Sequence, residues 1–137
     1  ENMYPWRVSG QEIKMYLPDY NPIPQDYDYV TWDFSHAATA KMDSLAAIKL
    51  LGSRLAHVHL TDGSGTAADE HLLPGYGHQR VVESLRYIAE SDYDGVICIE
   101  VSTRGQKYPG HREEMLAEAL AFTRKHVARN ITTQGET

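Results

Sequence analysis

The chain has 137 residues, of which 42% are hydrophobic, and its 19 acidic and 13 basic side chains give a formal net charge of −6. This length favours a single domain, and the acidic balance gives no broad electrostatic reason to bind a nucleic-acid backbone. One cysteine excludes an intramolecular disulfide framework and a thiolate zinc cluster. No apolar run approaches the roughly 18 residues of a membrane span, and no basic-then-apolar signal pattern opens the sequence. These observations predict a cytoplasmic globular protein without a membrane partner.

The first thirty residues differ in texture from the rest. They contain several aromatic residues and the prolines Pro5, Pro18, Pro22 and Pro24. Proline breaks a helix, so only Gln11–Leu17 has room for a short one. We interpret the segment as a long, ordered loop, because its aromatic content argues against a disordered linker.

Beyond residue 28 the predicted strands and helices alternate. In chain order they are a strand at Tyr29–Phe34, a helix at Asp43–Leu51, a strand at Leu55–Leu60, a Gly-rich loop at Thr61–His78, a helix at Arg80–Glu90, a strand at Gly95–Val101 and a helix at Arg112–Ala128. Asp43 or Ser44 is placed to cap the first of these helices. This alternation predicts an α/β fold with a parallel sheet.

The pattern within the strands indicates which kind of α/β fold. Successive side chains point to opposite faces, and each strand has one wholly apolar face suited to covering by helices. The opposite face of each strand ends in a metal-capable side chain: Asp33, His59 or Glu100. An open doubly wound sheet needs both faces apolar, whereas a (β/α)8 barrel becomes polar at its C-terminal mouth. The strands therefore predict a TIM barrel.

The length allows only part of such a barrel. A complete one takes about 250 residues, so we expect residues 1–137 to form one domain that is incomplete at its N-terminal side. Half a barrel leaves two sheet edges unpaired, and the chain opens at Glu1 without an initiator Met. The expected partner is therefore either the missing N-terminal half of a longer polypeptide or a second copy of this chain in a homo-oligomer.

Ligand-type side chains occur at four places. Glu1 opens the sequence, Asp33 and His36 form a D-x-x-H at the end of one strand, and His59 and Glu100 end the next two. Each alone is more often a helix cap or a packed residue, but the joint pattern at successive strand ends favours a metal site. Carboxylates with imidazole suit a divalent manganese, magnesium, cobalt or zinc ion, because softer ions prefer thiolates.

The loop Asp69–Gly77 is a further candidate. Asp69 and His71 are placed to ligate a second ion or to contact a phosphate or hydroxyl, although the Pro and Gly residues equally fit ordinary turn chemistry, and no phosphate-binding fingerprint is present. Arg104, just beyond the last strand, is a candidate contact for an anion or hydroxyl. Cys98 lies mid-strand, which predicts a buried packing thiol.

Taken together, five segments resemble the xylose isomerase-like TIM-barrel superfamily. They are Glu1-Asn2, Asp33–His36, His57–Asp62, Asp69–Gly77 and Ile99-Glu100. This superfamily holds both sugar or sugar-phosphate isomerases and epimerases and the endonuclease IV-type apurinic endonucleases. The resemblance covers nearly the whole chain and implies the C-terminal half of a TIM barrel, from the end of strand 5 through strand 8 and the last helix.

The resemblance also implies roles for individual residues. The metal ligands that it implies are Glu1, Asp33, His59 and Glu100. In the epimerase branch, Glu1 and Glu100 also act as acid/base groups on opposite faces of the substrate carbon, and His36 contacts substrate. The substrate-binding residues expected on this basis are His36, Asp69, His71 and Arg104.

Two branches of the superfamily compete. We favour a metal-dependent sugar or sugar-phosphate isomerase or epimerase, because removing a proton next to a carbonyl needs a nearby carboxylate base and a divalent ion that stabilises the enediolate. In the endonuclease branch, Asp69 and His71 match ligands of an additional zinc, but the acidic loops around the expected mouth argue against binding of duplex DNA. A zinc-dependent apurinic endonuclease and a non-catalytic metal-binding half-barrel are the alternatives.

Overall fold

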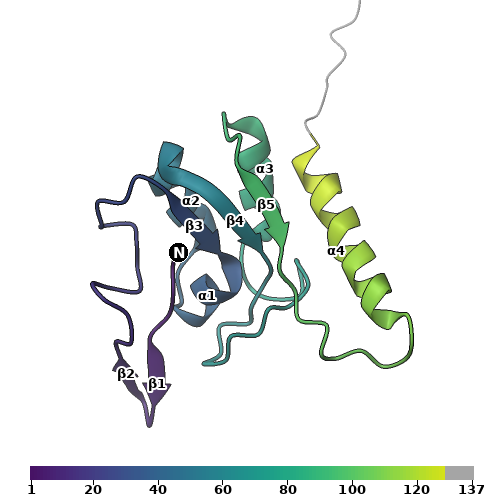
Figure 1. Cartoon of the computed structure of the whole chain (residues 1–137), viewed down its shortest axis with the longest axis horizontal. Coiled ribbons are helices and arrows are strands. Elements are labelled where there is room, and N and C mark those ends of the chain that lie inside the picture. The colour runs from purple at the N-terminus through teal and green to yellow at the C-terminus, as the bar shows by residue number, and fades with distance from the viewer. Residues whose placement is uncertain (129–137) are drawn as a thin grey trace, which may run out of the picture.

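The computed structural model describes residues 1–128, and its strands and helices alternate as the sequence predicts (Figure 1). In chain order the elements are β1 (Trp6–Val8), β2 (Gln11–Ile13), β3 (Val30–Asp33), α1 (Phe34–Thr39), α2 (Ser44–Leu51), a 3-10 turn (Gly52–Arg54), β4 (Leu55–Leu60), α3 (Val81–Glu90), β5 (Val96–Ile99) and α4 (His111–Val127).

The centre of the fold is a parallel sheet in the order β3-β4-β5. Its register places Asp33 of β3 beside His59 of β4, and His59 beside Cys98 of β5. Parallel strands end at the same edge of a sheet, so the side chains at their C-terminal ends meet there. The α/β class and the parallel sheet are therefore confirmed.

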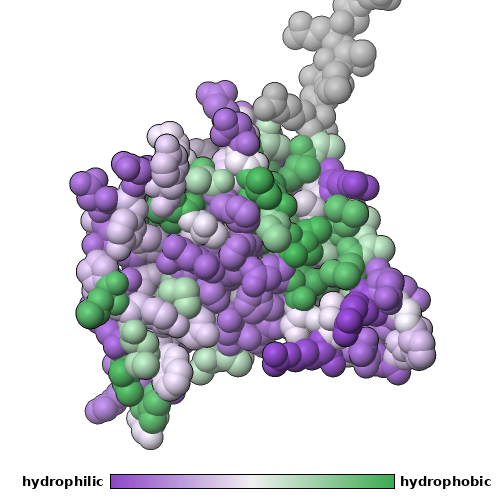
Figure 2. Space-filling view, in the orientation of Figure 1, coloured by the Kyte–Doolittle hydropathy of each residue, from purple (hydrophilic) through white to green (hydrophobic). Residues whose placement is uncertain are grey.

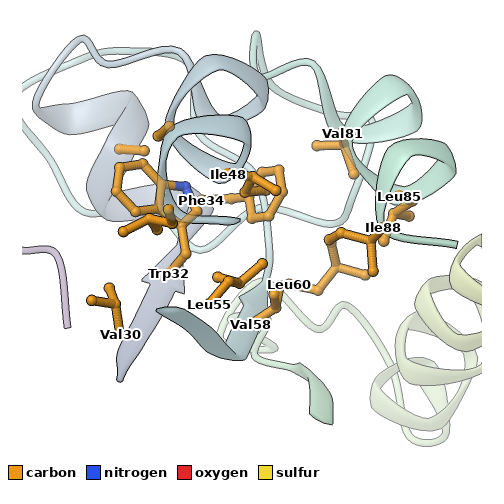
Figure 3. Packing of buried hydrophobic residues seen from close by; sticks show 13 residues of the cluster. Val30, Trp32, Phe34, Ile48, Leu55, Val58, Leu60, Val81, Leu85 and Ile88 are labelled. Atoms are coloured by element: carbon orange, nitrogen blue, oxygen red, sulfur yellow. The ribbon is translucent and has the colours of Figure 1, made fainter. Parts of the chain in front are cut away.

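One face of this sheet forms the hydrophobic core. Trp32 and Val58 alternate inward from β3 and β4 and are fully buried against Ile48 of α2 and Leu85 of α3 (Figure 3). Figure 1 shows α2 and α3 side by side on this face, with α4 next to α3. Burial of each large apolar side chain contributes about 1.5–3 kcal/mol to the stability of the fold. The helices therefore cover the face on which the alternating apolar residues of the strands lie.

Two aspartates start the helices that follow β3. The Oδ1 atom of Asp33 accepts a hydrogen bond from the backbone N–H of His36, and Asp43 does the same for Ala46. Such N-caps satisfy N–H groups that the first helical turn leaves without partners. Because Asp33 caps α1 directly, Phe34 begins the helix instead of ending the strand, as the sequence had suggested.

The N-terminal segment, interpreted from the sequence as a long loop, contains a β-hairpin. Residues Gln11–Ile13 pair antiparallel with Trp6–Val8 across the dipeptide Ser9-Gly10, whose φ angles are 51° and 80°. A two-residue hairpin turn of this kind requires positive φ at both positions. Gln11–Leu17, the one stretch with room for a short helix, forms none, because residues 11–13 pair as a strand instead.

The second face of the sheet is open at β5. Val96 is 58% exposed and Cys98 is exposed, so no described element covers β5 on this side, and the prediction of a buried thiol is wrong. Figure 2 shows hydrophobic residues gathered over β5 and α4, where Leu116 and Leu120 are also exposed. Among residues 1–128, no helix is both long and apolar enough to cross a lipid bilayer.

Candidate metal centre

Three of the four expected metal ligands surround one histidine. The Nδ1 atom of His59 lies 2.8 Å from Oε2 of Glu100, 3.2 Å from Oε1 of Glu1 and 3.6 Å from Oδ2 of Asp33. Glu1, Asp33 and His59 each offer a ligand atom within 4.8 Å of the others. The structure therefore brings Glu1, Asp33 and His59 into one group and places Glu100, the fourth expected ligand, against His59.

The chemistry of these donors fits a divalent cation. Oδ2 of Asp33 and Nδ1 of His59 are buried and have no hydrogen-bond partner among the described residues, although carboxylate oxygens lie close to the imidazole. A buried polar atom without a partner costs free energy. Here several carboxylate oxygens and one imidazole nitrogen face one another without forming well-aligned hydrogen bonds. Such a set of ligand atoms matches the preferences of manganese, magnesium, cobalt and zinc.

Burial also affects the protonation of the central carboxylate. Asp33 is fully buried, and this burial raises its pKa above the ordinary value, although the nearby His36 and its backbone N–H act in the opposite direction. A cation bound beside Asp33 favours the ionised form. Proton and metal therefore compete for the same oxygen.

A second cluster adjoins the first and is centred on Asp69. Its Oδ2 lies 3.2 Å from Nε2 of His36 and 3.0 Å from Nε2 of His71, while Oδ1 accepts a hydrogen bond from the Ser35 hydroxyl. The Nδ1 atoms of His36 and His71 face the backbone carbonyls of Asn2 and Glu100. A carbonyl oxygen only accepts, so each Nδ1 carries a proton and each Nε2 is directed to the carboxylate.

The charges in this cluster stabilise one another. The hydrogen bond to Asp69 raises the pKa of His71 to about 9. Burial lowers the pKa of His36, but Asp69 and Asp33 outweigh burial and leave it above the ordinary value. Burial acts to raise the pKa of Asp69, yet the hydrogen bonds from His36, His71 and Ser35 hold it well below its usual range. Without a metal, the His71 imidazole is therefore protonated at neutral pH.

The remaining candidates lie at the rim. Arg104 and Ser102 line a cleft of about 380 Å³ together with Asp69, His71 and Glu100. This volume lies within the usual range for small-molecule sites. His57 lies deeper along β4, and its ring meets His59 edge-on with ring centroids 5.2 Å apart.

Asp62 shapes the loop that carries Asp69 and His71. Its buried carboxylate accepts hydrogen bonds from the backbone N–H groups of four residues: Gly63, Gly75, Gly77 and Gln79. Its backbone also exchanges two hydrogen bonds with Leu72. Sequence reasoning gave Asp62 no such role, because nothing in the sequence indicates which backbone groups converge on a carboxylate.

Gly77 offers a direct test of this loop. A Cβ there would collide with the Asp62 carboxylate and would lie 2.5 Å from the carbonyl oxygen of Gly63. We expect Gly77→Ala to lower the free energy of unfolding by about 1–3 kcal/mol, the usual cost of overpacking. Urea unfolding measures this change. Gly105→Ala is the matched control, because a Cβ at Gly105 meets nothing within 4 Å, and equal stabilities for the two variants would contradict this account of the loop.

Residues 29–126 match the profile of the xylose isomerase-like TIM barrel family. The chain belongs to that family. The match covers β3, β4 and β5 with their helices, and therefore Asp33, His36, His59 and Glu100. Membership of the xylose isomerase-like TIM barrel family agrees with the resemblance drawn from the five sequence segments.

The chain is also similar to individual proteins and to a solved structure. An uncharacterized protein of Mycobacterium tuberculosis is 38% identical over 148 residues, which cover 94% of this chain and 53% of that protein. Fructoselysine 3-epimerase of Escherichia coli O157:H7 is 36% identical over 59 residues, or 43% of this chain and 21% of the enzyme. The crystal structure of a D-tagatose 3-epimerase-like protein superposes with a TM-score of 0.57 at 30% identity, covering 93% of this chain and 48% of that one. The chain spans about half the length of the M. tuberculosis relative.

Proposed function

We propose that this protein is a metal-dependent isomerase or epimerase of sugars or sugar phosphates that removes a proton next to a carbonyl. The observation that carries the proposal is the convergence of Glu1, Asp33, His59 and Glu100, two of which present buried atoms without hydrogen-bond partners. The similarity to two proteins named as 3-epimerases or epimerase-like supports the same reaction class.

The roles of the carboxylates follow from this chemistry. Glu1, Asp33, His59 and Glu100 would hold the ion, which would stabilise negative charge on the oxygens next to the reacting carbon. Asp33 is the most buried of the four and suits a purely ligating role. Glu1 and Glu100 are more exposed, with side chains 33% and 48% accessible, so each has room to reach a carbon-bound proton. General-base catalysis by such a group contributes about 10²–10⁴-fold.

The second cluster would orient the substrate. The raised pKa values of His36 and His71 favour the protonated forms of both imidazoles, and a protonated imidazole donates hydrogen bonds to hydroxyl and carbonyl oxygens. Arg104 lies in the cleft beside Glu100, where a guanidinium suits a distal hydroxyl or a phosphate. This arrangement fits a polar substrate that extends from the metal centre into the cleft.

Solvent exchange tests the proposal. The protein, supplied in turn with Mn²⁺, Mg²⁺, Co²⁺ and Zn²⁺, is incubated with ketoses and ketose phosphates in deuterium oxide, and NMR follows the hydrogen next to the carbonyl. Metal-dependent incorporation of deuterium is the expected result, since an enediolate exchanges its proton with solvent. Metal binding without exchange for any substrate would instead support a non-catalytic module.

The cluster of His36, Asp69 and His71 favours one alternative, a zinc-dependent apurinic endonuclease. In both histidines Nδ1 faces a backbone carbonyl and Nε2 faces a shared carboxylate, which is how metal-ligating histidines are commonly oriented. Cleavage of abasic DNA in the presence of zinc, without deuterium exchange into any sugar, would replace the isomerase proposal with this one.

We further propose that the chain forms the C-terminal half of a TIM barrel and needs additional strands to complete it. The open face of β5 and the exposed Leu116 and Leu120 of α4 support this proposal, because apolar patches and free strand edges promote association. We expect sedimentation of the purified 137-residue chain to reveal self-association. A stable monomer at all concentrations would contradict the expectation.

A further inference from the structure

Asn2 is a fully buried polar residue that lies beside β3. Its backbone N–H donates a hydrogen bond to the carbonyl of Thr31, and its side chain binds the backbone of Asp33, two residues further along the strand. Oδ1 accepts from the backbone N–H of Asp33 at 2.6 Å, and Nδ2 donates to the backbone carbonyl of Asp33 at 2.9 Å. One amide group thus satisfies both backbone polar groups of Asp33.

The backbone of Asn2 makes a further contact with the site. Its carbonyl oxygen lies 2.9 Å from Nδ1 of His36 and can only accept, so this contact requires a proton on Nδ1. Glu1 precedes Asn2 directly, and its Oε1 lies 3.3 Å from the same imidazole nitrogen. Asn2 therefore connects Glu1, Asp33 and His36, although its own side chain is directed at the backbone.

The position of Asp33 depends on these contacts with Asn2. The side chain of Asp33 has one oxygen committed to the cap of α1 and the other without a partner, so its direction depends on how the backbone is held. The described chain has no strand hydrogen-bonded to β3 on the side away from β4. At Asp33, the side-chain amide of Asn2 supplies the two backbone hydrogen bonds that such a strand would otherwise make.

We propose that Asn2 is a positioning residue that sets the spacing of Glu1, Asp33 and His36. The role in metal binding rests on the proposed function, whereas the positioning itself concerns the metal-free protein. Groups that only orient metal ligands typically change metal affinity by about 10–100-fold when removed. We expect a loss of that size from Asn2→Ala.

The first test uses the unmodified, metal-free chain and NMR. We expect the backbone amide of Asp33 and the side-chain amide protons of Asn2 to exchange slowly with solvent, and Nδ1 of His36 to carry a proton. Fast exchange of both amides would overturn the proposal without any variant. This measurement also covers the case in which Asn2→Ala fails to fold.

The second test compares Asn2→Ala with Ser44→Ala. Ser44 is equally buried and accepts a hydrogen bond from Nε1 of Trp32, but it lies at the start of α2, away from the site. Both variants are expected to lose stability in urea. Only Asn2→Ala should accelerate exchange of the Asp33 amide, shift the ring signals of His36 and weaken Mn²⁺ binding by about 10–100-fold.

The outcomes separate the two proposals. If the unmodified chain binds none of the four divalent ions, the metal-dependent function fails, and the metal-free signals of Asp33 and His36 still decide the role of Asn2. If Asn2→Ala leaves those signals unchanged, or perturbs them no more than Ser44→Ala does, Asn2 is only a structural residue and the inference is wrong.

Discussion

Replacing Asp33 with Asn is expected to weaken divalent-metal binding by about 100-fold or more, above the effect typical of groups that merely orient a ligand. The substitution preserves size and leaves one oxygen to cap α1, because Oδ1 is the atom that accepts from His36. It replaces the buried, unpartnered oxygen with an amide nitrogen that cannot bind a cation. Isothermal titration with Mn²⁺ measures the loss.

Asp43→Asn is the matched control for this experiment. Asp43 also caps a helix through Oδ1, but it caps α2, and its side chain is 45% exposed. Both substitutions therefore make the same chemical change to an N-cap aspartate, and only Asp33 belongs to the candidate metal centre. Retention of metal affinity in Asp33→Asn, or an equal loss in Asp43→Asn, would remove Asp33 from the ligand set.

Replacing Glu100 with Gln is expected to reduce deuterium exchange into substrate by about 10²–10⁴-fold, the usual contribution of a general base. The amide keeps the shape of the side chain but removes both its charge and its basicity. Since Oε2 of Glu100 lies 2.8 Å from His59, metal affinity should fall as well. Exchange is therefore measured at saturating metal, so that the two effects are separated.

Glu113→Gln provides the comparison, because Glu113 lies in the first turn of α4 and outside the cleft. It should retain both metal affinity and exchange. If Glu100→Gln retains full exchange at saturating metal, then Glu100 is at most a ligand, and Glu1 becomes the remaining candidate base.

The strand pattern made much of the candidate site predictable. A strand has a side-chain period of two, so the apolar residues of β3 and β4 specify the buried face and simultaneously assign Asp33 and His59 to the other one. The parallel arrangement then brings the strand ends together. Neither step requires knowledge of the loops, and for that reason these residues could be nominated before the structure was known.

The hairpin and the contacts of Asn2 and Asp62 were not predicted, because no periodic pattern in the sequence indicates them. The hairpin turns at Ser9 and Gly10, which both adopt positive φ, and a Ser-Gly dipeptide is a sequence signal only for a turn, not for the pairing of the strands beside it. Asn2 and Asp62 act through backbone groups. A polar side chain that binds backbone is indistinguishable in the sequence from one that faces solvent.

The way Asp62 holds its loop divides that loop into two parts with different freedom to vary. The backbone N–H groups of Gly75, Gly77 and Gln79 bind the Asp62 carboxylate, and Leu72 pairs with the Asp62 backbone. Asp69 is hydrogen-bonded to Ser35 and His71, whereas Thr66–Ala68 are exposed. An insertion between Thr66 and Ala67, such as a short peptide tag or a fluorophore attachment site, is therefore expected to leave the histidines in place. A change of loop length at Thr66–Ala68 would therefore leave the residues that line the cleft, among them Asp69 and His71, in register.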